Sequence, residues 1–165
     1  MESNEHNNTA LRLQELSVSD FEIADHQPDI TGWELVDSEG NELGEVEDLI
    51  FDRELRKVRY LVVSLELDEL DNSRLVLIPI GIVSLDEGNE EVLIPGNLVY
   101  SLTTLPAYRP GTVVSPAEEL AVRYAFMGKD GLMIEVTDVY ESHPEDFYAH
   151  EHFNDTHFRK RNQHL

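Results

Sequence analysis

Short apolar runs alternate with acidic, Gly- and Asn-bearing turns along residues 30–95. Short runs at regular spacing, separated by turn signals, are typical of the strands of a small β-sandwich or barrel. No run with a helical period interrupts this stretch, which disfavours a parallel sheet built from strand–helix–strand units. The pattern predicts six strands, at residues 32–37, 43–52, 58–66, 74–80, 81–86 and 90–94.

The second of these strands breaks its own period. Val46 and Leu49 are three positions apart, with Glu47 and Asp48 between them, whereas Leu49 and Phe51 alternate normally. One extra residue restores a common apolar face, so we predict a β-bulge at Glu47–Asp48. Bulges help a small sheet to coil into a barrel.

The third and fourth strands are apolar on both faces, at residues 60–63 and 75–78. Because a strand with one wet face would alternate cleanly, a terminal segment or a second subunit is expected to cover the outer face. The residues expected in one barrel core or at its rim are Trp33, Val46, Leu49, Phe51, Tyr60, Val62, Leu75 and Leu77. The residues predicted to bind a protein partner are Leu61, Val63, Val76, Ile78, Phe147 and Phe153.

The flanking segments divide the chain into an N-terminal arm (1–29), a barrel domain (30–110) and a C-terminal extension (111–165). Residues 10–29 are interpreted as an arm that packs on the barrel, as a short helix or an extended segment. A short helix is expected at residues 98–105 and a longer one after Ser115, which is a good N-cap before a proline. The longer helix should end at Met127 and present Leu120, Tyr124 and Met127 on one face, with Val122 and Phe126 beside it. Residues 132–140 suit a seventh strand.

Charge narrows the function classes. The chain has 34 acidic and 12 basic residues, a net charge of -22, and no cysteine. Phosphate binding needs clustered Lys and Arg, so nucleic acid and bare anionic membranes are poor partners. No apolar run approaches membrane-spanning length, and a cytoplasmic protein is expected.

The one local group of bases lies at a predicted turn and the start of the following strand: Arg53, Arg56, Lys57 and Arg59. We expect these bases to be solvated and paired with nearby carboxylates. The alternative is a docking point for an acidic partner or for the acidic N-terminal arm.

The C-terminal tail interleaves histidines with aromatic residues. His150, His152 and His157 are the candidates for a metal site, but nothing in their spacing fixes convergent ligands. We therefore expect an aromatic tail that docks on the barrel, no metal and no cofactor. No nucleophile motif or phosphate loop is present, so we expect no enzymatic activity. The alternative is a metal-binding protein or metal-dependent enzyme that uses this tail.

Four segments together carry a family resemblance: Gly32–Leu49, Arg56–Val63, Val76–Gly81 and Val92–Gly96. In this order they resemble a PRC-barrel domain, the family named for the cytoplasmic barrel of the photosynthetic reaction centre H subunit. The resemblance covers residues 30–110 and implies a small, strongly bent six-stranded barrel. It also implies an adaptor that binds proteins, and it allows association with an electron-transport complex.

The sequence departs from two well-known members of that family. It has no N-terminal membrane helix like that of the H subunit, and none of the H subunit's proton-delivery residues aligns. It also lacks the N-terminal domain of the ribosome-maturation factor that shares this barrel. It is more similar to stand-alone bacterial PRC-barrel proteins, and we predict a homodimer assembled through the extensions.

Overall fold

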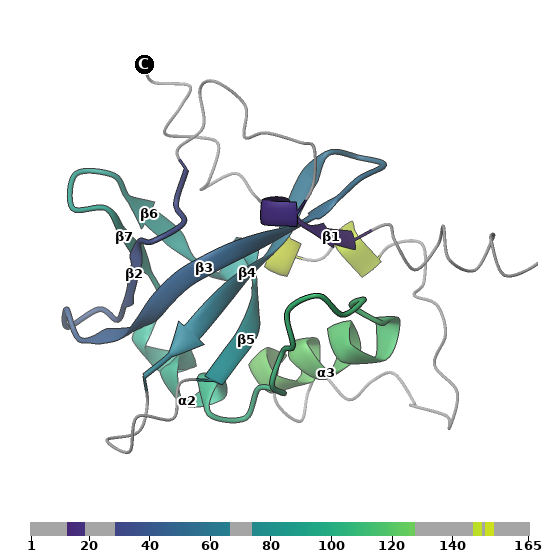
Figure 1. Cartoon of the computed structure of the whole chain (residues 1–165). Coiled ribbons are helices and arrows are strands. Elements are labelled where there is room, and N and C mark those ends of the chain that lie inside the picture. The colour runs from purple at the N-terminus through teal and green to yellow at the C-terminus, as the bar shows by residue number, and fades with distance from the viewer. Residues whose placement is uncertain (1–12, 19–28, 67–73, 128–146, 150, 154–165) are drawn as a thin grey trace, which may run out of the picture.

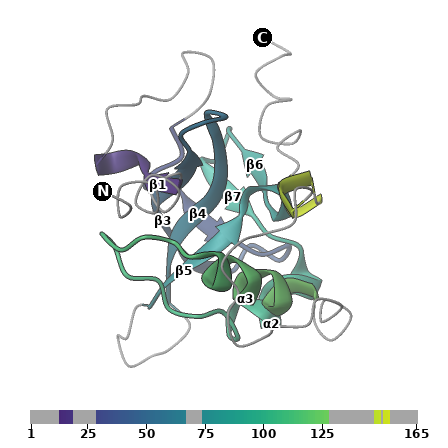
Figure 2. The same cartoon turned by 90° about the vertical axis from the view of Figure 1, so that its right-hand side faces the viewer.

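The computed structural model describes residues 13–18, 29–66, 74–127, 147–149 and 151–153. Within them the chain is mainly β, as predicted, and its helices lie on one side of the sheet (Figures 1 and 2). The strands are β1 Leu13–Glu15, β2 Glu34–Val36, β3 Glu42–Asp52, β4 Lys57–Leu65, β5 Arg74–Pro79, β6 Ser84–Asp86 and β7 Glu91–Leu93. The α-helices are α2 Val99–Leu102 and α3 Pro116–Met127. The 3-10 turns are η1 Leu16–Val18, η2 Ile80–Ile82, η3 Gly96–Leu98, η5 Phe147–Ala149 and η6 Glu151–Phe153.

The long strand β3 organises the sheet, whose order is β5-β4-β3-β2-β7-β6. Neighbouring strands are antiparallel except β2 and β7, which are parallel. One edge of β3 pairs with β4; its other edge pairs with β2 near Glu42 and with β1 near Asp52. In the described part of the chain, hydrogen bonds do not close the sheet between β5 and β6, so the predicted barrel is open along that line.

Two bulges bend the β3–β4 pair. Val46 pairs with Val63 and Asp48 with Val62, which leaves Glu47 as the extra residue of β3 and confirms the predicted bulge. A second register shift follows: Ile50 pairs with Tyr60 but Phe51 with Val58, which leaves Arg59 as the extra residue of β4. Each bulge increases the local twist and redirects the side chains beside it.

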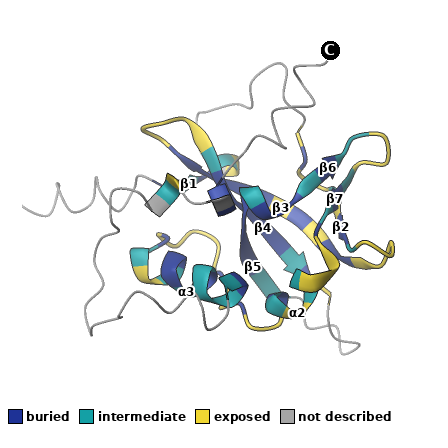
Figure 3. Ribbon diagram, turned by 180° about the vertical axis from the view of Figure 1, so that it is seen from behind, coloured by how far each residue is buried: buried dark blue, intermediate teal, exposed yellow. Residues whose placement is uncertain are grey.

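The core runs along β3 and β4, with an unbroken run of buried residues in the second half of β3 and the middle of β4 (Figure 3). Tyr60 to Val63 are all at most 1% exposed, so both faces of β4 are buried as predicted. The residues packed with them include Val122 and Phe126 of α3 and Phe153 of η6. All eight residues expected in the core or at its rim are buried or packed against the core. The cover on β4 that the structure describes therefore comes from the same chain.

Two predicted elements differ from the structure. The expected strand 81–86 begins with the turn η2, and only β6 is extended. Pro79 ends β5 because it has no N–H to donate, and η2 then turns Ile80 and Ile82 into the core. The helix expected at residues 98–105 ends at Leu102, because the hydroxyls of Thr103 and Thr104 donate back to the preceding turn.

Helix α3 has the predicted bounds but not the predicted face. The Ser115 Oγ accepts the N–H of Glu118 at 3.1 Å, which is the expected N-cap bond. The buried residues are Glu119, Leu120, Val122 and Phe126, whereas Tyr124 and Met127 are half-exposed. The predicted stripe through Tyr124 and Met127 was therefore wrong: the helix is rotated so that a carboxylate points inward. The strand suggested for residues 132–140 lies outside the described residues.

We predict that Gly44→Ala destabilises the fold by about 2 kcal/mol or more, as expected for overpacking. A Cβ at Gly44 of β3 would lie 2.2 Å from the carbonyl oxygen of Ser64, a backbone atom of β4 that cannot move alone. The matched control is Gly88→Ala, whose Cβ would meet only the Asp86 carboxylate at an ordinary 3.5 Å. Urea unfolding should show a change within about 0.5 kcal/mol for the control. Equal effects of the two substitutions would contradict the close β3–β4 contact.

Candidate functional site

Three buried polar side chains come from β4 and α3: Arg59 and Tyr60 of β4, and Glu119 of α3. We call these three residues the β4–α3 site. The Tyr60 hydroxyl donates to Glu119 Oε1 at 2.9 Å, and both side chains are at most 3% exposed. A buried carboxylate is tolerated only where donors replace the water it has lost. The site is therefore a specific polar arrangement inside an apolar interface.

The bulge in β4 explains how Arg59 reaches this site. Strict alternation would place Arg59 and Tyr60 on opposite faces, but Arg59 is the extra residue of the pairing. Its Nη2 lies 3.4 Å from Asp52 Oδ2, and Asp52 also accepts the N–H groups of Glu54 and Leu55. Arg59 is paired as predicted but buried, so the expectation of a solvated base was wrong for this residue.

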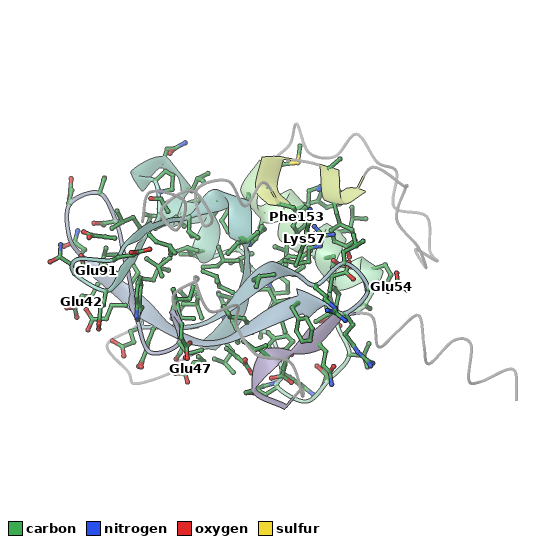
Figure 4. All side chains as sticks on the ribbon, turned by 90° about the horizontal axis from the view of Figure 1, so that it is seen from above. Glu42, Glu47, Glu54, Lys57, Glu91 and Phe153 are labelled. Atoms are coloured by element: carbon green, nitrogen blue, oxygen red, sulfur yellow. The ribbon has the colours of Figure 1, made fainter. Side chains whose placement is uncertain are left out.

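The other three bases of that group are exposed, as expected. Arg53, Arg56 and Lys57 all lie at the β3–β4 turn. Glu54 and Lys57 mark that end of the molecule in Figure 4. The positive charge of the turn is therefore on the surface, whereas the Arg59 side chain is buried.

Residues 147–149 and 151–153, which we call the C-terminal aromatic segment, complete the β4–α3 site. The Tyr148 hydroxyl donates to Glu119 Oε1 at 2.5 Å, the same oxygen that Tyr60 uses. The Arg59 guanidinium lies over the Tyr148 ring, 4.4 Å from its centroid. The Glu119 carboxylate thus contacts the Tyr148 hydroxyl, and the Arg59 guanidinium contacts the Tyr148 ring. Both interactions are stronger where water is excluded.

Two further ring contacts fix the segment. The Phe153 ring is 5.4 Å from Tyr60 and 5.0 Å from Tyr148, edge-on to both. His152 lies edge-on to Phe126 of α3, with 6.2 Å between ring centroids. These separations are those of favourable aromatic pairs. The prediction of an aromatic tail that docks on the barrel is confirmed for the described part of the tail.

The N-terminal arm is held by the other bulge. β1 pairs with β3, and the N–H and hydroxyl of Ser17 donate to the Asp48 carboxylate at 3.1 and 2.5 Å. Asp48 is buried and follows the extra residue Glu47. Glu15 accepts the N–H of Gly111 at 2.6 Å. The expected arm is therefore confirmed for residues 13–18, as a strand followed by a 3-10 turn.

The six predicted protein-binding residues have different surroundings. Leu61, Val63, Val76 and Ile78 have no exposed area and lie inside the chain's own core. Phe153 is 7% exposed and packs on Tyr60. The backbone of Phe147 lies in η5, and its side chain is outside the described part. Their contact with a second chain remains a prediction.

The sequence did not point to Glu119 of this site or to Tyr148, which contacts it, and it placed Arg59 only in the surface group of bases. An acid in the first turn of a helix is normal beside the helix dipole, so Glu119 gave no signal. The regular apolar alternation at Val58, Tyr60 and Val62 conceals the bulge at Arg59. Tyr148 is one of several aromatic residues in the tail.

The metal candidates are not brought together in the described residues. His152 is 9% exposed and packs on Phe126, whereas His150 and His157 lie outside the described part. In that part, no group of three or more His, Asp and Glu is placed to hold a metal ion. The absence of metal and cofactor in the protein stays a prediction.

The opposite end of β3 carries like charges. Glu34 pairs with Glu45 and with Glu91, and Glu42 lies near it in the same ladder. Figure 4 shows Glu42 and Glu91 at the end away from Lys57. The pKa of Glu34 is raised, mainly by a hydrogen bond with Glu42 and next by the negative charge of Glu42. Repulsion among these carboxylates should weaken as salt increases.

Burial changes the acidity of the tyrosine in the site. It raises the pKa of Tyr60 well above its ordinary value, because the phenolate would lose water, and the charge of Glu119 adds to the effect. Burial also raises the pKa of Tyr108, with help from the charge of Glu15. Both hydroxyls therefore stay protonated in the folded chain at pH values where an unfolded tyrosine ionises.

Comparison with known proteins adds one match. Residues 22–100 match the family described as PRC-barrel domain, the family that the sequence resembles. A search of curated proteins finds no match to the chain. Across the described residues, none of the helices has the length and apolar character needed to cross a membrane.

We predict that the free energy of unfolding falls as pH rises above about 10, because the unfolded chain releases phenolic protons that the folded chain keeps. Each such tyrosine contributes a slope of about 1.4 kcal/mol per pH unit. Tyr60→Phe should remove the contribution of Tyr60 to this pH dependence. It should also lower the free energy of unfolding by about 1–2 kcal/mol at pH 7, because the hydrogen bond to Glu119 is lost. Urea unfolding between pH 8 and pH 11 measures both effects.

The control is Tyr100→Phe, because Tyr100 is 78% exposed. It should leave both the slope and the stability at pH 7 unchanged. If the two variants lose stability in parallel as pH rises, Tyr60 does not keep its proton in the way its environment implies.

Proposed function

This chain carries a PRC-barrel domain, and on that basis we propose that it is a non-enzymatic adaptor that binds protein partners and forms a homodimer. PRC-barrel domains are often found in adaptor or partner-binding roles. The proposal includes a cytoplasmic location, which cell fractionation would test.

One observation carries the proposal: strand β4 is buried on both faces, and segments outside the sheet complete its cover. α3 contributes Val122 and Phe126, and the C-terminal aromatic segment contributes Phe153. On the other edge of β3, the arm adds β1. A sheet that takes up added polypeptide segments at separate places provides binding surfaces for partner chains by the same chemistry.

The polar groups also favour binding over catalysis. Arg59 bonds to Asp52, and Glu119 accepts bonds from two tyrosines, so these charged groups hold other parts of the chain. A catalytic acid or base instead needs reach to a substrate proton. His152, the described metal candidate, packs on an aromatic ring, which favours a structural role.

Two measurements separate this proposal from the metal-dependent alternative. Elemental analysis of the purified chain should find less than one tightly held zinc, nickel or manganese ion per chain. Affinity capture by the full chain should retain a protein partner at near-equal molar ratio. A stoichiometric ion that is lost on His152→Ala would instead favour the metal-binding function.

We predict a homodimer in solution at micromolar concentration, with about twice the 18.9 kDa mass of the chain. Each copy carries a net charge of -22, so association must bury enough apolar area to overcome repulsion, and salt should strengthen it. Sedimentation equilibrium at low and high salt measures the mass. A monomer under both conditions would refute self-association.

A further inference from the structure

We propose that the β4–α3 site is a recognition site for a segment that carries a Tyr and a Phe five residues apart, and that in the homodimer it takes up the C-terminal aromatic segment of a second copy. This inference rests on the proposed self-association and deepens it by naming the site and the residues exchanged. Each copy would then supply one site and one segment, which gives a closed two-fold dimer.

The site is selective for tyrosine over phenylalanine at its first position. Glu119 is buried and accepts the Tyr148 hydroxyl at 2.5 Å, while Arg59 contacts the same ring at 4.4 Å. A phenylalanine there would keep the ring contact but leave the buried carboxylate with one donor fewer. Sites built to bond a hydroxyl reject the analogue that lacks it.

The second position is aromatic and apolar. Phe153 packs edge-on between Tyr60 of the site and Tyr148 of its own segment, and it is 7% exposed. The two anchors therefore touch each other as well as the site. A few buried aromatic and charged anchors dominate the binding energy of most protein interfaces.

The described contacts that hold the segment are made by side chains. Among them are one hydrogen bond, one cation–π contact and three ring contacts, one of which lies within the segment. The segment consists of two 3-10 turns and is not a strand of the sheet. Replacing it with the same segment of another copy would therefore leave every ladder of the sheet intact.

The length of chain permits this exchange. Residues 128–146 connect α3 to the segment, and a chain of that length spans at most about 65 Å. A small domain is about 30 Å across. The segment that occupies the site of its own chain can therefore also reach the site of a neighbour.

The first test uses a fluorescein-labelled peptide with the sequence of residues 144–156, titrated into the full-length chain. The Tyr148→Phe/Phe153→Ala variant weakens the resident segment and should bind the peptide about tenfold more tightly than the unmodified chain, whose site is occupied. The same peptide with Phe in place of Tyr148 should bind that variant about tenfold more weakly. Adding Glu119→Gln to the receptor should reduce this discrimination.

Circular dichroism checks that each receptor is folded, and Tyr148→Phe alone is the milder receptor if the double variant is not. A folded, opened receptor that does not bind the peptide overturns the proposal. Equal affinity for the Tyr and Phe peptides overturns it as well, because the Glu119 carboxylate would then not distinguish a tyrosine hydroxyl from its absence.

The second test asks whether a second copy supplies the segment. A full-length chain with p-benzoylphenylalanine in place of Phe153 is refolded together with an equal amount of 15N-labelled chain and irradiated. In an exchanged dimer, roughly half of the cross-links to peptides that contain Tyr60 should join light to heavy chains. If sedimentation shows a dimer but every cross-link stays within one chain, exchange is refuted and the homodimer stands. If sedimentation shows a monomer, the proposed self-association fails, and the exchange fails with it.

Discussion

The bulged pairing of β3 with β4 is the constraint on which the rest of the structure depends. Without the extra residue Glu47, Asp48 would fall on the other face of the sheet, since a shift of one residue reverses every side chain. Without the extra residue in β4, strict alternation would place the Arg59 side chain on the face opposite to Tyr60. Each bulge therefore lies beside a charged side chain that contacts a terminal segment: Asp48 contacts Ser17, and Arg59 contacts Tyr148.

These two charges explain why the terminal segments occupy defined places rather than sliding over an apolar face. Hydrophobic burial has little direction, and the outer side of β4 would accept many apolar side chains. Ser17 on Asp48, and Tyr148 between Arg59 and Glu119, each satisfy buried groups that would otherwise be destabilising. Apolar area thus supplies most of the affinity, and the buried polar groups supply the register.

The sequence predicted most of the fold because its signals are local. Val46 and Leu49 break the strand period and reveal the first bulge, and Ser115 with its following proline marks the start of α3. The second bulge was not predictable, because the alternation around Arg59 is unbroken. Glu119 was not predictable either, because its role depends on a tyrosine 59 positions away. The apolar pattern showed that β4 needs a cover but could not identify the covering residues.

The same buried groups bear on whether the C-terminal aromatic segment can leave its site empty or only be replaced by another segment. Simple release would leave Glu119 with one donor fewer, remove the ring from Arg59 and uncover the apolar edge of Tyr60. Each of these changes is unfavourable when no replacement arrives. Because an empty site is unfavourable in free energy, the C-terminal aromatic segment should leave only when a segment with similar side chains takes its place. Under the proposed adaptor function, a partner that enters this site would have to displace the chain's own C-terminal aromatic segment.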